Sequence, residues 1–308
     1  MSDERAAALA FDLRELDDGF YADPFPTYHR LRRWDPVHRC PDGSYFLTRY
    51  EDVVAVYQDH RRFSSDKRVE FAPKFGDSPL YEHHTTSVVF RDPPDHTRIR
   101  RLFAPAFTPR ALAALEPRVE RLVDSLLDGA AARGGMDVVD DFAAALPIQL
   151  IGDMLGVPGD ERGPLRGWSL AILGALEPAP GPERLAAGNR AVEEFKDYLR
   201  RLIADRRRRP STDPGEILSA LLAAEGAGER LTELELLHQC VFLLNAGHET
   251  TTNLIANASS PCSSTPERGR GCAPSRTSCP APSRSSCATR APTSSATGAS
   301  SSRRRSAA

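Results

Sequence analysis

The sequence predicts a mainly α-helical protein with one small β-sheet near its N-terminus. Between residues 111 and 258, apolar side chains recur at the helical period of 3.6 residues in several long segments. The turn sequence Pro41-Asp42-Gly43, by contrast, separates two short segments of the kind that form a β-hairpin. With 40 % hydrophobic residues, 27 % charged residues and a net charge of −2, the 308 residues have the composition of a globular protein of one or two domains.

The predicted elements are separated by glycine, proline and polar turns. Gly134-Gly135 ends one amphipathic helix, and the run from Pro178 to Pro182 breaks the chain between two others. The hairpin strands are Val37–Arg39 and Tyr45–Arg49. Helices are expected at Phe25–Trp34, Tyr50–Asp59, Ala111–Ala132, Ala143–Leu155, Glu161–Leu176, Arg184–Arg209, Ile217–Leu222 and Glu233–Ala258.

Two segments are less regular. Residues 61–91 have weak periodicity, and His83-His84 within them are expected to be solvated loop histidines rather than ligands. Asp137–Asp141 is expected to begin a strand or turn. Its adjacent Asp140 and Asp141 fit the capping of the next helix better than a catalytic pair.

The longest predicted helix, Glu233–Ala258, contains the most informative stretch of the chain. Thr232 and Glu235 fit a capping box at its start, and at 1.5 Å per residue the helix would be roughly 39 Å long, enough to cross a domain. Residues 243–252 read Leu-Leu-Asn-Ala-Gly-His-Glu-Thr-Thr-Thr. A glycine costs about 1 kcal/mol in a helix interior, and threonines there lose rotamer freedom, so such a cluster indicates a site.

The residue types in this cluster suggest how a ligand would be held. Ala246 and Gly247 leave almost no side chain, so a flat or bulky group could lie against the backbone. Thr250 can bond to the carbonyl four residues earlier and loosen the helix. The alternative is a buried helix with a helix-contact glycine and satisfied threonines. A zinc-protease motif is excluded, because Thr252 stands where the second histidine ligand is required.

A second cluster, residues 92–107, reads Asp-Pro-Pro-Asp-His-Thr-Arg-Ile-Arg-Arg-Leu-Phe-Ala-Pro-Ala-Phe. Asp92 or Asp95 can cap a helix there. His96 and Arg100 are four residues apart and share one helix face, where two donors suit a pair of ligand carboxylates. Arg98 and Arg101 point elsewhere and are expected to be solvated; taken alone, His96 and Arg100 also read as surface residues.

The two clusters, in this order and about 150 residues apart, resemble the cytochrome P450 (P-450) family, specifically its soluble bacterial members. The resemblance covers residues ~10–258 and includes Pro24–Tyr28, Tyr45–Val53 and Phe107–Arg110. Each motif alone is moderately specific, but the ordered set is highly specific. It implies the N-terminal two-thirds of the cytochrome P450 fold over residues 1–258.

The resemblance also implies a cofactor, haem b with its iron, and roles for six residues. Ala246 and Gly247 would make room for dioxygen and substrate. Glu249 and Thr250 match the acid–alcohol pair that organises proton delivery, and a hydroxyl and a carboxylate in a mostly apolar pocket can relay protons while excluding bulk water. The two donors of the second cluster, His96 and Arg100, match the pair that holds the haem propionates.

The activity implied is that of a haem-thiolate monooxygenase, an oxidoreductase. Such an enzyme hydroxylates or epoxidises a small organic substrate with one atom of dioxygen. Its electrons come from NAD(P)H through ferredoxin reductase and ferredoxin. The substrate-facing segments would be residues 61–91 and 168–190, but they do not name the substrate.

Composition argues against other partners and compartments. No apolar run approaches the ~20 residues of a membrane span, and the N-terminal residues lack the apolar core of a signal peptide, so we expect a cytoplasmic protein without a membrane anchor. The arginines at 206–209 end a helix before Pro210, as cations commonly do, and no aromatic residues interleave with them, so nucleic-acid binding is not expected. No Cys-x-x-Cys pair occurs, which makes a zinc site improbable.

The composition changes abruptly after Ala258. Residues 259–308 contain no Val, Ile, Leu, Met, Phe, Trp or Tyr, and they hold 15 serines and 8 arginines against one glutamate. Such a segment cannot bury enough apolar surface to offset its ordering entropy, so we expect a disordered tail. We interpret this segment as translated out of frame. One plausible set of codons for Pro282–Arg290, read from the third base, encodes Val-Glu-Glu-Leu-Leu-Arg-Tyr-Glu. This sequence is similar to the family's Glu-x-x-Arg helix.

A frameshift would remove the iron ligand. The family's cysteine thiolate lies beyond this point in a glycine-rich loop, and neither Cys272 nor Cys279 has the aromatic, glycine and basic neighbours of that loop. No residue is therefore assigned as a metal ligand, and the chain is expected to be inactive. Two alternatives to a haem enzyme remain: a non-catalytic fragment, and a helical protein that binds an apolar ligand without haem.

Overall fold

The computed structural model describes residues 3–213, 215–224 and 231–264. It is mainly helical with one two-stranded sheet, as predicted. Two separate clusters of buried hydrophobic residues hold it together, a small one near the N-terminus and a large one built by the later helices. Among the described residues, no helix is both long and apolar enough to traverse a lipid bilayer.

The N-terminal part is built around the predicted hairpin. Gly43 has a φ of 84° at its turn, a conformation that favours glycine, and the strands pair antiparallel with His38 opposite Phe46. Phe11 and Leu31 form the small core against Phe46. The elements are α1 (Asp3–Leu9), α2 (Asp18–Ala22), α3 (Phe25–Trp34), β1 (Val37–Arg39), β2 (Tyr45–Leu47) and α4 (Tyr50–Gln58). The first two helices were not predicted.

The segment at residues 61–91 is more regular than its sequence indicated. It forms α5, α6 and η1, and His83 and His84 are buried inside it rather than solvated. The prediction of solvated loop histidines is therefore wrong. The elements here are α5 (Arg68–Phe75), α6 (Pro79–Thr86), η1 (Val88–Phe90), α7 (Asp95–Phe103), η2 (Ala104–Phe107) and α8 (Pro109–Arg133).

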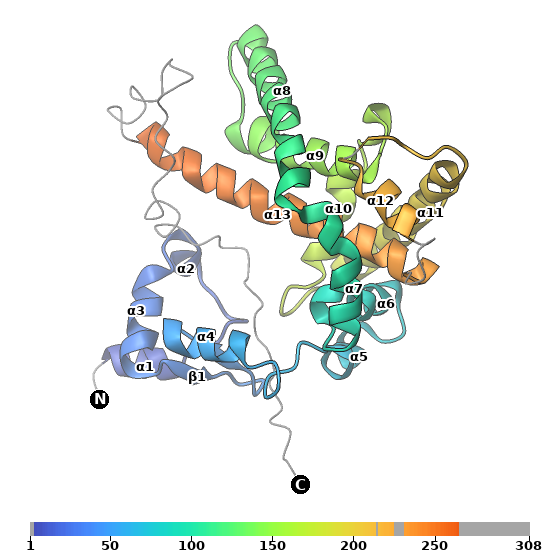
Figure 1. Ribbon diagram of the computed structural model, residues 1–308. Helices are drawn as coiled ribbons and strands as arrows, with labels where there is room; N and C mark the ends of the chain where they lie inside the picture. Colours follow the sequence, from blue (N-terminus) through green and yellow to red (C-terminus); the bar gives the residue numbers. More distant parts are fainter. Residues whose placement is uncertain (1–2, 214, 225–230, 265–308) are drawn as a thin grey trace.

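The remaining helices form the large core. Figure 1 shows α13 as a long helix running across the molecule, and α9, α10 and α11 pack along it. The expected strand or turn at 137–141 is instead a π-helix, η3, capped by Asp137. The prediction that Asp140 and Asp141 cap the following helix is wrong, because the N-cap of α9 is Ala144 and no side chain bonds to it. The elements are η3 (Val138–Ala143), α9 (Ala145–Leu155), η4 (Gly159–Glu161), α10 (Leu165–Gly174), α11 (Pro182–Arg208), α12 (Ile217–Ala224) and α13 (Glu233–Ser264).

Both ends of α13 bear on the sequence predictions. The capping box is confirmed: Thr232 N donates to Glu235 Oε2 at 2.9 Å, and Glu235 N donates to Thr232 Oγ1 at 3.2 Å. The helix continues to Ser264, past the predicted end at Ala258. The predicted disordered tail falls, beyond Ser264, outside the described residues.

Candidate functional site

One stripe of α13 is left uncovered by the described residues. Ala246, Thr250 and Leu254, spaced by four residues and therefore on one face, are all exposed, Leu254 by 52 %. Thr250 Oγ1 donates to the Ala246 carbonyl oxygen at 2.7 Å, so the predicted bond is confirmed. The stripe therefore offers a small residue, a hydroxyl oxygen with free lone pairs and an apolar side chain to whatever lies on it.

Gly247 does not belong to this stripe. A Cβ built on Gly247 would lie 2.5 Å from Cδ1 and 2.9 Å from Cγ1 of Ile151, which comes from α9. The space beside Gly247 is thus filled by a packing side chain. Gly247 therefore makes the helix contact that the alternative interpretation expected, and Ala246 is the small residue on the exposed face.

Glu249 lies next to Thr250 but points elsewhere. Adjacent side chains on an α-helix diverge by about 100°, so the predicted acid and alcohol do not share a face. Glu249 is half-buried, and its pKa is raised by burial and, to a smaller extent, by the negative charge of Glu177 just after α10. A carboxyl group of this kind holds its proton to higher pH than an exposed one, which suits a proton donor.

The helix α7 carries the other predicted pair. His96 is half-buried and Arg100 is exposed, and both lie on one face, as their spacing predicted. Neither aspartate caps the helix: Asp92 accepts from Ser65 N at 2.8 Å, and Asp95 pairs with Arg91 at 2.9 Å.

A residue expected to be solvated fixes α7 in place. Arg98 forms a two-pronged ion pair with Glu235 in the first turn of α13, with one arm at 3.3 Å. Ala246 lies eleven residues further along α13, or about 16 Å at 1.5 Å per residue.

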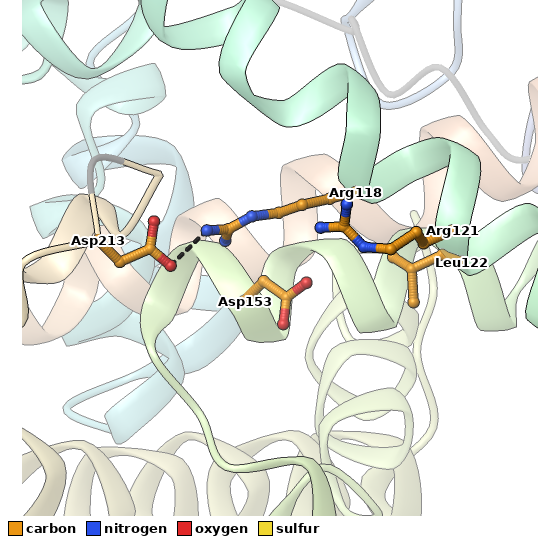
Figure 2. Close-up of a pocket in the computed structure, with 5 residues that line it drawn as sticks. All are labelled: Arg118, Arg121, Leu122, Asp153 and Asp213. Atoms are coloured by element: carbon orange, nitrogen blue, oxygen red, sulfur yellow. Dashed lines mark hydrogen bonds and ion pairs between the residues drawn. The ribbon is translucent and has the colours of Figure 1, made fainter.

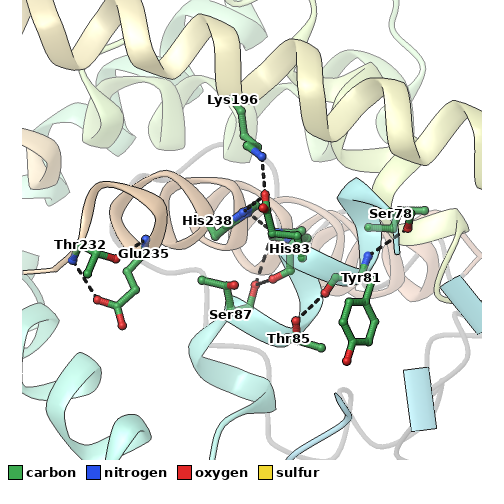
Figure 3. Close-up of polar contacts among 12 residues, drawn as sticks. Ser78, Tyr81, His83, Thr85, Ser87, Lys196, Thr232, Glu235 and His238 are labelled. Atoms are coloured by element: carbon green, nitrogen blue, oxygen red, sulfur yellow. Dashed lines mark hydrogen bonds and ion pairs between the residues drawn. The ribbon is translucent and has the colours of Figure 1, made fainter. Parts of the chain in front are cut away.

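A buried polar cluster was missed by the sequence reasoning (Figure 3). His83 Nδ1 lies 3.3 Å from His238 Nδ1, His238 Nε2 lies 2.8 Å from Glu82 Oε1, and Lys196 Nζ donates to the same carboxylate oxygen. Burial lowers the pKa of His238 to about 4. The hydrogen bonds of the cluster join α6, α11 and α13. Among the described residues, no group of His, Cys, Asp and Glu is arranged to hold a metal ion.

A surface depression of about 360 Å³ is lined by residues that lie outside α13 (Figure 2). Its charges are largely matched: Arg118 pairs with Asp213, and Asp153 pairs with Arg162 at 2.6 Å. The first pair joins α8 to the segment after α11, and the second joins α9 to the residue that follows η4, so we interpret the depression as a structural contact between these elements. Its lining residues are Arg118, Arg121, Leu122, Asp153 and Asp213.

Comparison with known proteins identifies the family. The family model described as "Cytochrome P450" matches residues 180–259. The chain is 39 % identical to cytochrome P450 monooxygenase PikC of Streptomyces venezuelae over 82 % of this chain and 59 % of the relative. It is 38 % identical to cytochrome P450 107B1 of Saccharopolyspora erythraea over 80 % of this chain and 60 % of the relative.

Solved structures agree with the sequence comparison. The structure of CalO2 matches with a TM-score of 0.75 at 35 % identity, covering 84 % of this chain and 64 % of the other. P450BioI, solved in complex with an acyl carrier protein carrying hexadec-9Z-enoic acid, matches with a TM-score of 0.74 at 30 % identity, covering 83 % and 65 %. The chain thus spans about 60 % of the length of the curated relatives it matches. It belongs to the cytochrome P450 family.

Proposed function

We propose that the described part of this chain is the oxygen-side half of a haem monooxygenase site. The observation that carries the proposal is the uncovered stripe Ala246–Thr250–Leu254 on α13, which lies in the segment matched by the family model. When bound, haem supplies the redox chemistry that splits dioxygen and oxidises a substrate. The reaction proposed is hydroxylation or epoxidation of a small organic molecule.

The chain's own residues would bind the cofactor and manage protons. His96 and Arg100 would hold the two propionates of haem, because a guanidinium and an imidazole on one helix face match two carboxylates. Ala246 would leave space above the ring. Glu249 would give up a proton, and the Thr250 hydroxyl, already donating to the Ala246 carbonyl, would accept and orient a water between them.

The thiolate side of the site is not supplied by the cysteines that the structure describes. Cys240 is fully buried, and burial raises its pKa to about 12, so it remains a thiol at neutral pH. Cys40 is buried beside the hairpin turn, and burial raises its pKa as well. The other cysteines lie at 262 and beyond, where no side chain is described.

We therefore propose that this chain by itself is inactive, because the family's iron-ligating thiolate lies in a glycine-rich loop that we do not identify in this sequence. Residues 1–258 would form a partial cytochrome P450 domain and 259–308 a tail translated out of frame. A complete enzyme of this kind would work in the cytoplasm with electrons from NAD(P)H, ferredoxin reductase and ferredoxin. An apolar-ligand protein without haem is the second candidate, because the open stripe needs no cofactor to accept an apolar surface.

A carbon monoxide difference spectrum tests the missing thiolate. The purified chain is mixed with haem, reduced and exposed to carbon monoxide, with the Streptomyces venezuelae relative as a positive control. We expect no band at about 450 nm, the position that thiolate ligation gives the family. A band there would overturn the proposal, and failure to take up haem at all would favour the haem-free alternative.

Haem titration of an α7 variant tests the propionate pair. We expect Arg100→Gln to weaken haem binding about 10- to 100-fold, because a hydrogen bond to a charged group contributes about 1.5–3 kcal/mol. Arg101→Gln, which removes the same charge from the adjacent position, is the matched control and should bind haem as the wild type does. Equal losses in both variants would assign the effect to net charge and not to a specific pair.

A further inference from the structure

The backbone hydrogen bonds at the two ends of the N-terminal hairpin show how its strands are paired. Near the turn, Cys40 N donates to the Ser44 carbonyl oxygen at 2.8 Å. At the other end, Thr48 N donates to the Pro36 carbonyl oxygen at 3.1 Å. In an antiparallel pair of strands, residues whose N–H and C=O point at the partner strand alternate with residues whose N–H and C=O point away from it. The two end pairs therefore fix the direction of every backbone group between them.

Four residues of the hairpin turn their backbone groups outward. They are Val37 and Arg39 on β1 and, directly opposite them, Leu47 and Tyr45 on β2. Among the residues that the structure describes, no hydrogen bond from outside the hairpin reaches the backbone of Tyr45 or Leu47, and no element other than β1 packs extensively against β2. The strand β2 therefore has an open edge that offers two N–H donors and two carbonyl acceptors.

The two edges of the hairpin differ in the features that prevent strand pairing. The edge of β1 carries the exposed Arg39, and prolines stand on both sides of the strand, at Pro36 and Pro41. Charged side chains and prolines are the usual means by which proteins keep other strands away from a sheet edge. The segment 44–48 around β2 contains neither a charged residue nor a proline. The β2 edge is therefore the one that can accept a further strand.

The β2 edge is complementary to a second copy of itself. If two β2 strands lie antiparallel about a two-fold axis with Phe46 opposite Phe46, each Tyr45 lies opposite Leu47 of the other copy. Each of these pairs can exchange two hydrogen bonds, so every outward N–H and C=O of both edges finds a partner. We propose that this chain forms a two-fold dimer in which two β2 edges join the two-stranded sheets into one continuous sheet.

The side chains of β2 fit this pairing on both faces of the sheet. On one face, Tyr45 is 44 % exposed and would lie across from the half-buried Leu47 of the second copy, and aromatic–aliphatic pairs of this kind stabilise a sheet. On the other face, Phe46 packs at the margin of the small N-terminal core. Its Cα would lie about 4.5 Å from that of Phe46 in the second copy, which makes the two small cores contiguous.

Charge and size set the character of the dimer. Because residues 44–48 are uncharged, no like charges meet across the two-fold axis, and this favours a second copy over a strand of a charged partner. A two-stranded sheet is marginally stable by itself, so both copies gain from the extension. The strands are short, however, and an interface of this size gives a weak, reversible dimer that depends on protein concentration.

Sedimentation of the haem-free chain over a range of concentrations tests the dimer and its edge. We expect a dimer with a Kd on the order of 100 µM. Leu47→Pro removes an outward N–H but no bond within the hairpin, so half of the bonds between the copies are lost and Kd should rise at least about 10-fold. Val37→Pro, directly opposite on the β1 edge, is the matched control and should dimerise as the wild type does. A monomer at every concentration, or equal effects of both prolines, would overturn the proposal.

Nuclear magnetic resonance of the wild type decides the question even if a proline variant fails to fold. In a mixture of isotope-labelled and unlabelled chains, a nuclear Overhauser effect should connect the Phe46 α protons of two copies. Amide exchange at Tyr45 and Leu47 should slow as the concentration rises, whereas the Phe46 amide, bonded within the hairpin, should be protected throughout. A dimer without these signals would use another surface, and the proposal would be wrong. None of these measurements needs haem, so their outcome is independent of the proposed monooxygenase site.

Discussion

Replacing Gly247 by alanine is expected to destabilise the protein by about 1–3 kcal/mol, even though alanine is the better helix former. The new methyl group would lie 2.5 Å from Cδ1 of Ile151, so either the side chain of Ile151 must leave its rotamer or α9 must move away from α13. Urea unfolding of the wild type and Gly247→Ala measures the difference.

Two further variants give this prediction its control. Gly167→Ala in α10, where no atom lies within 4 Å of the added Cβ, should stabilise the protein by about 0.4–1 kcal/mol. Ile151→Val, which shortens the clashing side chain, should make the double variant less unstable than the sum of the single changes. Additive effects would mean that Gly247 is required for something other than its contact with α9.

The contact between Gly247 and α9 shows which features of the site could be predicted from the sequence and which could not. The motif placed Ala246, Glu249 and Thr250 on one helix, and the threonine's bond to the carbonyl four residues back followed from local geometry alone. Which side of the helix meets a neighbour depends on α9, more than ninety residues earlier, and no local pattern records that. Two small residues in a row therefore looked alike, although one faces α9 and the other is exposed.

The same limit explains the errors outside α13. Predicted elements with strong periodicity or turn residues, such as Phe25–Trp34 and the hairpin, agree closely with the structure. Arg98 was expected to be solvated because its partner, Glu235, lies 137 residues away. His83 and His84 were expected in a loop because α6 is short and polar, but α5, α11 and α13 pack against it and bury both rings. Long-range partners, not local propensity, decided each of these cases.

The buried histidines lead to a second large effect, an early loss of stability in acid. Burial lowers the pKa of His84 to about 3, that of His238 to about 4, and that of His83 well below its usual value, with smaller contributions from neighbouring cations and histidines. In the unfolded chain these rings take up protons at about pH 6.5. The unfolded state therefore binds more protons between about pH 6.5 and pH 3–4, so the stability due to these neutral rings is complete above pH 6.5 and falls as the pH drops through that window.

The size of the effect follows from the same shifts. One pKa unit corresponds to about 1.4 kcal/mol, so a single histidine that stays neutral down to about pH 4 costs roughly 3 kcal/mol of stability once the pH is well below that value. That amount is a large part of the free energy of unfolding of an ordinary domain, which is about 5–15 kcal/mol. We expect the free energy of unfolding to decrease at every step below pH 6.5 when it is measured in urea at about pH 7.5, 6.5, 5.5 and 4.5.

His84 is the residue at which this expectation can be isolated. Its ring packs edge-on against Phe71 and Phe90, and its Nε2 is buried without a partner among the described residues. His84→Phe keeps an aromatic ring, removes the unpaired nitrogen and removes one proton-binding group. The variant should be at least as stable as the wild type at neutral pH, and its stability should fall less steeply in acid. His60→Phe, at an exposed position, removes a histidine without touching the cluster and serves as the control. If the acid slope of His84→Phe equals that of the wild type, His84 takes up its proton equally in the folded and unfolded protein, and its burial does not cause the loss of stability in acid.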